Sequence, residues 1–192
     1  MRRSKNWLVA GVMGLVVVGL AAPSAAQETP KVEVAGGWNY IAARFDAGDE
    51  WQHLYRGGFA EVAVNLNDRW GAVGNVAYDQ KTVVEIEGDV KFKMIPYLFG
   101  VRFSERRNEK TVPFVHFLAG ATQLKASLGS ESVDETSLTW QVGGGLNINA
   151  SGRLGARAGI DYMRIQGADD GELSGGEAIQ GLRISAGIVV GF

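Results

Sequence analysis

Cysteine is absent from the sequence, and this absence removes several kinds of chemistry at once. Without a thiol the chain forms no disulfide, holds no metal through thiolates, offers no Cys nucleophile and accepts no lipoprotein acyl group. Histidine is scarce, with only His53 and His116 present, so there are few candidates for a general base. A sustained apolar period of 3.6 residues is also missing after residue 26, which indicates an all-β chain.

The first 26 residues predict a secretory signal peptide. Basic residues at positions 2, 3 and 5 precede an apolar run over 7–22, and small residues occupy positions 24 and 26. We expect cleavage after Ala26, which divides the chain into a signal peptide, 1–26, and one domain, 27–192. A membrane anchor is the alternative, but the run is short for a span of ~20 residues and Pro23 follows it directly.

The charge balance argues against nucleic acid as a partner. Removal of residues 1–26 takes three of the 19 Lys and Arg residues, so 16 remain against 21 Asp and Glu, a net charge of −5. Nucleic-acid-binding proteins need a basic surface to neutralise phosphates. The sequence therefore predicts that the mature protein does not bind nucleic acid.

Apolar and polar residues alternate with a period of two along most of the mature chain. Between 137 and 149, for example, Leu138, Trp140 and Val142 alternate with Thr139 and Gln141. This period is typical of a β-strand with two different faces. The same pattern predicts eight strands, at 31–44, 51–66, 70–79, 90–103, 112–125, 137–149, 153–166 and 179–192.

The predicted connections alternate in length. Those at 45–50, 80–89, 126–136 and 167–178 are long and polar, whereas those at 67–69, 104–111 and 150–152 are mostly shorter. Short turns at one end and longer loops at the other are typical of transmembrane barrels with an even number of strands. We therefore predict an eight-stranded antiparallel up-and-down transmembrane β-barrel, with a soluble sandwich or lipocalin-type barrel as the alternative.

The chemistry of the two strand faces favours the membrane barrel. One face combines charged and amide side chains with most of the glycines, which suits a narrow lumen better than an open surface. The other face is apolar, and its aromatic residues fall into two groups by height, as expected at two membrane interfaces. We expect one girdle of Trp38, Tyr40, Tyr78, Trp140 and Tyr162 near the loops, and one of Trp70, Phe103 and Phe192 near the turns.

The last strand carries a short pattern of its own. Ser185, Gly187, Val190 and Phe192 follow the order polar, x, Gly, x, x, apolar, x, aromatic. In this respect the chain resembles the small outer-membrane β-barrel family, whose transmembrane domains are of the OmpA/OmpX type. The resemblance implies export to the outer membrane, and it implies that the barrel-assembly machinery recognises these four residues. It also implies lipid and lipopolysaccharide as surroundings, and we expect a monomer.

Five charged residues lie on the predicted inward face, namely Glu61, Arg102, Arg157, Asp161 and Arg183. An eight-stranded barrel is just wide enough for side chains to fill it, and buried charges must be paired. Asp161 is expected opposite or diagonal to Arg183, and Arg157 is expected within reach of Glu61. We interpret the five as a structural network of ion pairs that fills the lumen, rather than as an acid–base site.

Neither histidine has the neighbours that catalysis requires. A lipid-modifying enzyme needs a His with a hydroxyl and a carboxylate, but Phe114 and Leu118 flank His116 on its face, and Gln52 and Leu54 flank His53. We therefore expect no enzymatic activity, no cofactor and no metal site.

Carboxylates are frequent in the predicted loops: Asp46, Asp49, Glu50, Glu85, Glu87, Asp89, Glu131, Asp134, Glu135, Asp169, Asp170, Glu172 and Glu177. They lack the ligand spacing of a calcium loop and indicate solvated loop charge. The sequence therefore favours a structural or surface-interaction role through acidic external loops. A small-solute pore and a lipid-modifying enzyme are the alternatives.

Overall fold

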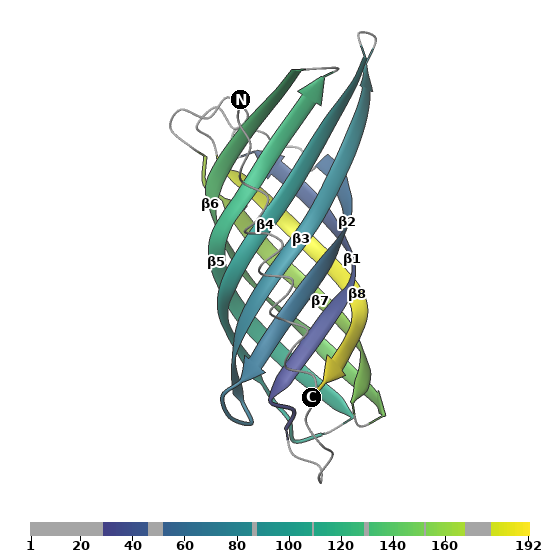
Figure 1. The fold of residues 1–192 in the computed structure, drawn as a ribbon, viewed down its shortest axis with the longest axis vertical. Coiled ribbons are helices and arrows are strands. Elements are labelled where there is room, and N and C mark those ends of the chain that lie inside the picture. The colour runs from purple at the N-terminus through teal and green to yellow at the C-terminus, as the bar shows by residue number, and fades with distance from the viewer. Residues whose placement is uncertain are drawn as a thin grey trace, which may run out of the picture.

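The computed structural model describes residues 29–45, 52–85, 88–108, 110–128, 131–151, 153–167 and 178–192. Its eight strands form one closed antiparallel barrel in which each strand pairs with its neighbours in sequence and β8 pairs with β1 (Figure 1). The strands are β1 (Val32–Phe45), β2 (Gln52–Asn65), β3 (Trp70–Glu85), β4 (Gly88–Ser104), β5 (Thr111–Leu128), β6 (Glu131–Ser151), β7 (Leu154–Ile165) and β8 (Ile179–Gly191). Within the described ranges, no helix is long and apolar enough to span a membrane.

The register shows how strongly the strands are staggered. Cross-strand partners followed from Glu33 around the barrel lead back to β1 at Ala43, ten residues further along that strand. Such a stagger tilts the strands by about 35–45° from the barrel axis, and Figure 1 shows this oblique course. We name the end with the C-terminus and the β2–β3, β4–β5 and β6–β7 connections the turn end, and the opposite end the loop end.

The predicted class, strand number and antiparallel order are confirmed, but two of the predicted loops are wrong. Most of 80–89 and 126–136 continues as strand, so that β3 to β6 extend at the loop end beyond β1, β2, β7 and β8 (Figure 1). These segments are rich in polar residues, and that polarity led the sequence analysis to place loops there. The predicted loops 45–50 and 167–178 fall largely outside the described residues.

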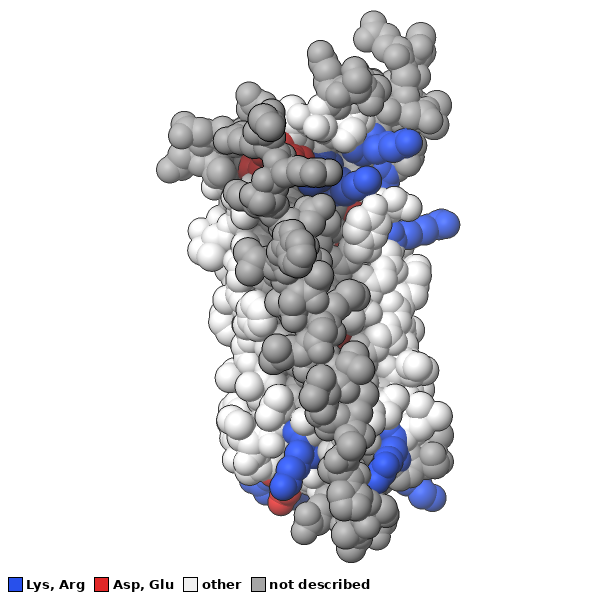
Figure 2. Space-filling view, viewed as in Figure 1, with Lys and Arg blue, Asp and Glu red and all other residues white. Residues whose placement is uncertain are grey.

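The outward face carries an apolar belt, and the apolar runs along the strands define its upper and lower limits. On β7 the apolar outward run extends from Leu154 to Tyr162 and ends before Arg164; on β8 it extends from Phe192 back to Leu182. Runs of about 9–11 residues are the length that crosses a bilayer on a tilted strand. Figure 2 shows Lys and Arg side chains near both ends of the barrel and an almost uncharged wall between them.

Above the belt, the polarity of the two faces is reversed. Lys93 points outward on β4 while Met94 is buried inside, and Gln123 is exposed on β5 while Leu124 is buried. Inside the loop end, buried apolar residues pack into one group, which we call the upper apolar cluster: Ile41, Ala43, Met94, Leu124, Met163 and Ile165, with Ile179 against it. The belt thus faces lipid only up to this level.

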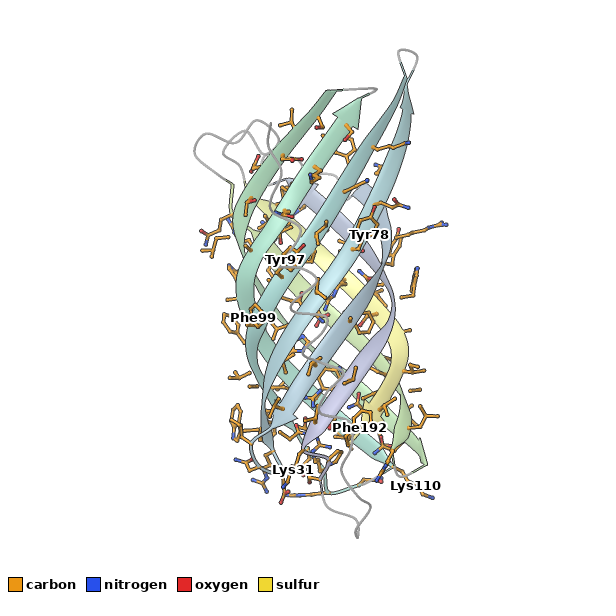
Figure 3. All side chains as sticks on the ribbon, in the orientation of Figure 1. Lys31, Tyr78, Tyr97, Phe99, Lys110 and Phe192 are labelled. Atoms are coloured by element: carbon orange, nitrogen blue, oxygen red, sulfur yellow. The ribbon has the colours of Figure 1, made fainter. Side chains whose placement is uncertain are left out.

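The aromatic girdles have the predicted arrangement on the outward face. Trp38 stacks on Tyr40 with ring centroids 6.2 Å apart, and Trp140 lies 5.6 Å from Tyr162. At the turn end Trp70 and Phe103, partners across β3 and β4, are 5.2 Å apart. Figure 3 shows Tyr78 and Tyr97 in the upper part of the wall and Phe192 near its lower edge; Tyr97 was not predicted as a girdle residue.

Candidate functional site

The lumen holds the candidate site, and the five predicted residues all point into it. Glu61, Arg102, Arg157, Asp161 and Arg183 are buried, with at most 4% of each residue exposed. They come from β2, β4, β7 and β8, where the period of two directs every second side chain inward. They form two groups, one toward the turn end and one at mid-height.

The group toward the turn end is centred on Glu61. Arg157 donates a hydrogen bond to Glu61 from across the lumen, as expected from the sequence, and its Nε donates to Asn147 Oδ1 over 2.8 Å. A second guanidinium nitrogen, from Arg102, lies 3.5 Å from Glu61. The negative charge of Glu61 therefore partly neutralises two arginines.

Glu33 is a second carboxylate of this group, and the sequence analysis missed it. Arg102 and Arg106 each lie 2.5 Å from one of its two oxygens, and Asn65 donates a hydrogen bond to it over 3.1 Å. Glu33 stands in β1 at the same parity as the inward Asn39, which is the signal that identifies it as a lumen residue.

Phe114 supplies an aromatic face to the same arginines. The Arg157 guanidinium lies 4.8 Å from the centroid of the ring and that of Arg102 lies 5.7 Å from it. Cations at this distance are attracted by the ring quadrupole. The ring and the carboxylates together replace the water that these arginines lose on burial.

The mid-height group is centred on Asp161. Arg183 is its direct cross-strand partner, and the closest nitrogen is 3.0 Å from the carboxylate. On the other side His116 Nε2 lies 2.7 Å from Asp161 Oδ1, and Gln141 Nε2 lies 3.4 Å from the same ring nitrogen. An alanine at Gly143 would place its Cβ 2.1 Å from Asp161 Oδ1, so this glycine makes room for the carboxylate.

Asn75 joins the two groups into one network. Its Nδ2 donates to Glu61 over 3.2 Å, and its Oδ1 accepts from Arg183 over 3.3 Å. A continuous polar path therefore leads from Arg106, beyond the end of β4, to Gln141. We call this the lumen network: Glu33, Glu61, Asn75, Arg102, Arg106, His116, Gln141, Arg157, Asp161 and Arg183.

The lumen network combines four arginines with three carboxylates, and its polar groups bond mainly to each other. In the described chain, the hydrogen-bond partners of the His116 side chain are Asp161 and Gln141, and neither is a hydroxyl. The described residues also contain no group of three or more metal-ligating side chains.

Two sequence-predicted features lie partly outside this description. His53 falls in β2 opposite Ala42, beside a register shift, and its side chain is outside the described residues. Most of the predicted loop carboxylates lie there as well. Asp134 and Glu135 were predicted in a loop, but both belong to strand β6. The Asp134 carboxylate pairs with Lys125 over 2.8 Å. The Glu135 side chain is buried and accepts a hydrogen bond from the Ser137 hydroxyl.

The closing strand places the four residues of the predicted assembly pattern along the seam with β1. Ser185 and Gly187 face the lumen, whereas Val190 and Phe192 face outward. Gly187 is paired with Gly37, and a Cβ on Gly187 would lie 2.2 Å from the Gly36 carbonyl oxygen. The glycine therefore allows the first and last strands to approach closely. Phe192 continues the seam through hydrogen bonds of 2.8 and 3.2 Å with the backbone of Val32.

Comparisons with solved structures identify the same fold. Neisserial surface protein A has a TM-score of 0.67 at 14% identity, over 86% of this chain and 100% of that chain. Ail, the attachment invasion locus protein of Yersinia pestis, has a TM-score of 0.58 at 19% identity, over 84% and 99%. The outer membrane protein OprG from Pseudomonas aeruginosa has a TM-score of 0.53 at 13% identity, over 87% and 98%.

Sequence comparison gives the family. Curated proteins yield no match. The family model for the outer membrane protein beta-barrel domain, however, matches residues 13–190, which is most of the chain. The chain therefore belongs to the outer membrane protein beta-barrel domain family, and its place is the outer membrane.

Proposed function

We propose that the protein is a non-enzymatic outer-membrane barrel with a closed lumen and a structural or surface-interaction role. The observation that carries this proposal is the lumen network, which joins side chains from opposite walls. The hydrogen bond from Arg157 on β7 to Glu61 on β2 crosses the interior. A water-filled channel needs a wider barrel or a lumen without such bridges.

The upper apolar cluster adds a second barrier in series with the network. Ile41 and Met163 are each 1% exposed, and Met94 is 3% exposed, so the loop end of the lumen is packed with apolar side chains. An ion that passed the cluster would lose much of its hydration, because the polar groups beside the cluster, such as Asp79 opposite Met94 and Glu135 opposite Leu124, are themselves buried. This argues against the small-solute pore.

The environment of His116 argues against the lipid-modifying enzyme. The ring lies inside the barrel, where 6% of the residue is exposed, whereas a lipid substrate would approach the outward face. A buried base without a hydroxyl partner does not activate a nucleophile. The remaining role is exerted through the surface, by the hairpins at the loop end and their predicted acidic residues.

Purified protein in vesicles tests the proposal against both alternatives. Vesicles that contain lipopolysaccharide and an entrapped small solute are assayed for solute escape and for chemical change of the lipopolysaccharide, with a porin and empty vesicles as the two controls. We expect neither activity above empty vesicles. Solute escape at porin-like rates would establish the pore, and modified lipopolysaccharide would establish the enzyme; either result overturns the proposal.

A further inference from the structure

The charges in the turn-end half of the lumen do not balance. Among the described residues, three arginines lie there with two carboxylates. We call these five residues the turn-end group: Glu33, Glu61, Arg102, Arg106 and Arg157. With all five ionised, the group carries one positive charge in excess.

The other buried carboxylates of the described lumen do not supply the missing negative charge. Asp161 already has an arginine partner at mid-height. Asp79 and Glu135 belong to the loop-end half, where they are the cross-strand partners of Met94 and Leu124 in the upper apolar cluster. The excess of positive charge therefore remains at the turn end.

The two most deeply buried arginines of the turn-end group share the same carboxylate oxygens. Glu61 Oε1 accepts a hydrogen bond from Arg157 and lies 3.5 Å from Arg102 Nη1. Glu33 Oε2 lies 2.5 Å from Arg102 Nη2 and 3.7 Å from Arg157 Nη2. Both guanidinium groups also face the ring of Phe114. The shared partners thus hold two like charges side by side, where a low dielectric strengthens their repulsion.

Several nitrogen atoms of these arginines have no hydrogen-bond acceptor among the described residues. They are Nε and Nη1 of Arg102, Nη2 of Arg157 and Nε of Arg106. The Arg102 and Arg157 side chains are only 0% and 3% exposed, and a buried donor without an acceptor destabilises the fold. The excess charge and the unpartnered donors therefore occur at the same place.

We propose, beyond the structural role of the lumen network, that the turn-end group binds one chloride ion between the guanidinium groups of Arg102 and Arg157. A single negative charge cancels the excess, and a spherical anion accepts N–H donors from several directions. An eight-stranded barrel is just wide enough for side chains to fill it, so the lumen selects a small anion over a large one.

Arg106 lies at the entrance to this site. It follows the end of β4, and its side chain is 14% exposed. The turn end of an outer-membrane barrel faces the periplasm, so the anion enters from that side. Loss of the Arg106 charge would leave two arginines with two carboxylates. Arg106 therefore determines whether the turn-end group requires an anion.

Equilibrium unfolding by urea in phosphatidylcholine vesicles tests the site. Sodium gluconate is replaced stepwise by sodium chloride at constant ionic strength, because gluconate is too large for the lumen. The unfolding midpoint of the wild type should rise with chloride and level off as the site fills. Arg106→Gln should lose at least half of this rise. The matched control Arg107→Gln, which removes the neighbouring arginine with 83% of its side chain exposed, should keep all of it.

The midpoint in gluconate alone separates this site from an ordinary ion pair. Arg106→Gln should unfold there at the same urea concentration as the wild type or at a higher one, because it removes the excess charge. A lower midpoint, or an equal rise with chloride in all three proteins, would overturn the proposal. Crystals soaked in bromide locate the ion. We expect an anomalous peak between Arg102 and Arg157, and peaks confined to the outer surface would contradict the assignment.

Discussion

At the residue scale, the charged side chains fall into two environments with different energetics. Within the lumen network, Glu61 is buried and faces two arginines. At the turn end, Glu105 is partly exposed and lies 3.6 Å from Arg107, whose side chain is 83% exposed. Loss of one partner from a buried pair leaves a charge without water or counter-ion, whereas exposed pairs contribute little.

Glu61→Gln should therefore destabilise the folded barrel by about 3 kcal/mol, the lower end of the range for breaking a buried pair. The lower end applies because Arg157 keeps a second carboxylate, Glu33, at 3.7 Å. The measurement is urea unfolding in vesicles, followed by Trp fluorescence. The matched control Glu105→Gln should change the stability by less than about 1 kcal/mol.

A second variant separates loss of the charge pair from loss of packing. Glu61→Gln/Arg157→Gln removes one charge of each sign and should be more stable than Glu61→Gln alone, because Arg102 and Arg106 then no longer share Glu33 with a third arginine. If the double variant were destabilised relative to the wild type by the sum of the two single effects, the two residues would not interact in the folded protein.

At the element scale, strand alternation was predictable from the sequence, but the ends of the strands were not. Period-two alternation persists above the apolar belt with its polarity reversed, as the outward Lys93 and the inward Met94 show. A search for strands with an apolar outward face therefore stops at this level. The extension of β3 to β6 becomes visible only when the cross-strand register is known.

The contacts within the lumen network were likewise predictable only in part from the sequence. Asp161 and Arg183 belong to consecutive strands, so a hairpin between them was enough to predict their contact. The contact between Glu33 and Arg102 joins β1 to β4, and residues on such distant strands reach the same height only through the stagger of the whole barrel. The sequence does not state the stagger, so the contact between Glu33 and Arg102 was not predicted, although the parity of Glu33 in β1 marks it as a lumen residue.

The position of the belt predicts where an added charge is costly. Val142 faces outward within the belt, with 46% of the residue exposed, and Val142→Arg should destabilise the barrel by about 2–4 kcal/mol. Gln123 faces outward above the belt, and Gln123→Arg should cost about 0–1 kcal/mol. Refolding into lipid vesicles at increasing urea concentration measures both. Equal costs at the two sites would mean that the belt is misplaced.

The closing strand leads to a prediction that separates assembly from stability. Phe192 is 39% exposed on the outward face, and its apolar burial contributes at most about 1.5–3 kcal/mol. If the assembly machinery recognises this residue, Phe192→Asp should reduce the amount of barrel in the outer membrane of cells far more than it reduces refolding of purified protein in detergent. Quantitative immunoblots of membrane fractions measure the amount of barrel in the outer membrane, and gel-shift assays measure the refolded fraction in detergent. Wild-type amounts in cells together with poor refolding would assign Phe192 a structural role only.

At the scale of the whole molecule, closure of the sheet pairs both edges of every strand within the described part of the apolar belt. β8 bonds to both β7 and β1, so backbone groups within the membrane are satisfied inside the sheet. The mature protein should therefore remain folded in sodium dodecyl sulfate until it is heated. Electrophoresis should show two mobilities, one before and one after boiling, for protein recovered in the outer-membrane fraction. A single mobility for protein recovered in the soluble periplasm would be inconsistent with this account.

The filled lumen is the central claim, and electrical recording from single molecules in a planar lipid bilayer tests it most directly. The network that links Glu61 to Arg157 and the upper apolar cluster lie in series along the axis, so the wild-type protein should give no steady current above that of the bare bilayer. Insertion is verified in the same membrane by an antibody against an added epitope. Steady, ohmic current steps from the wild-type protein would contradict the claim.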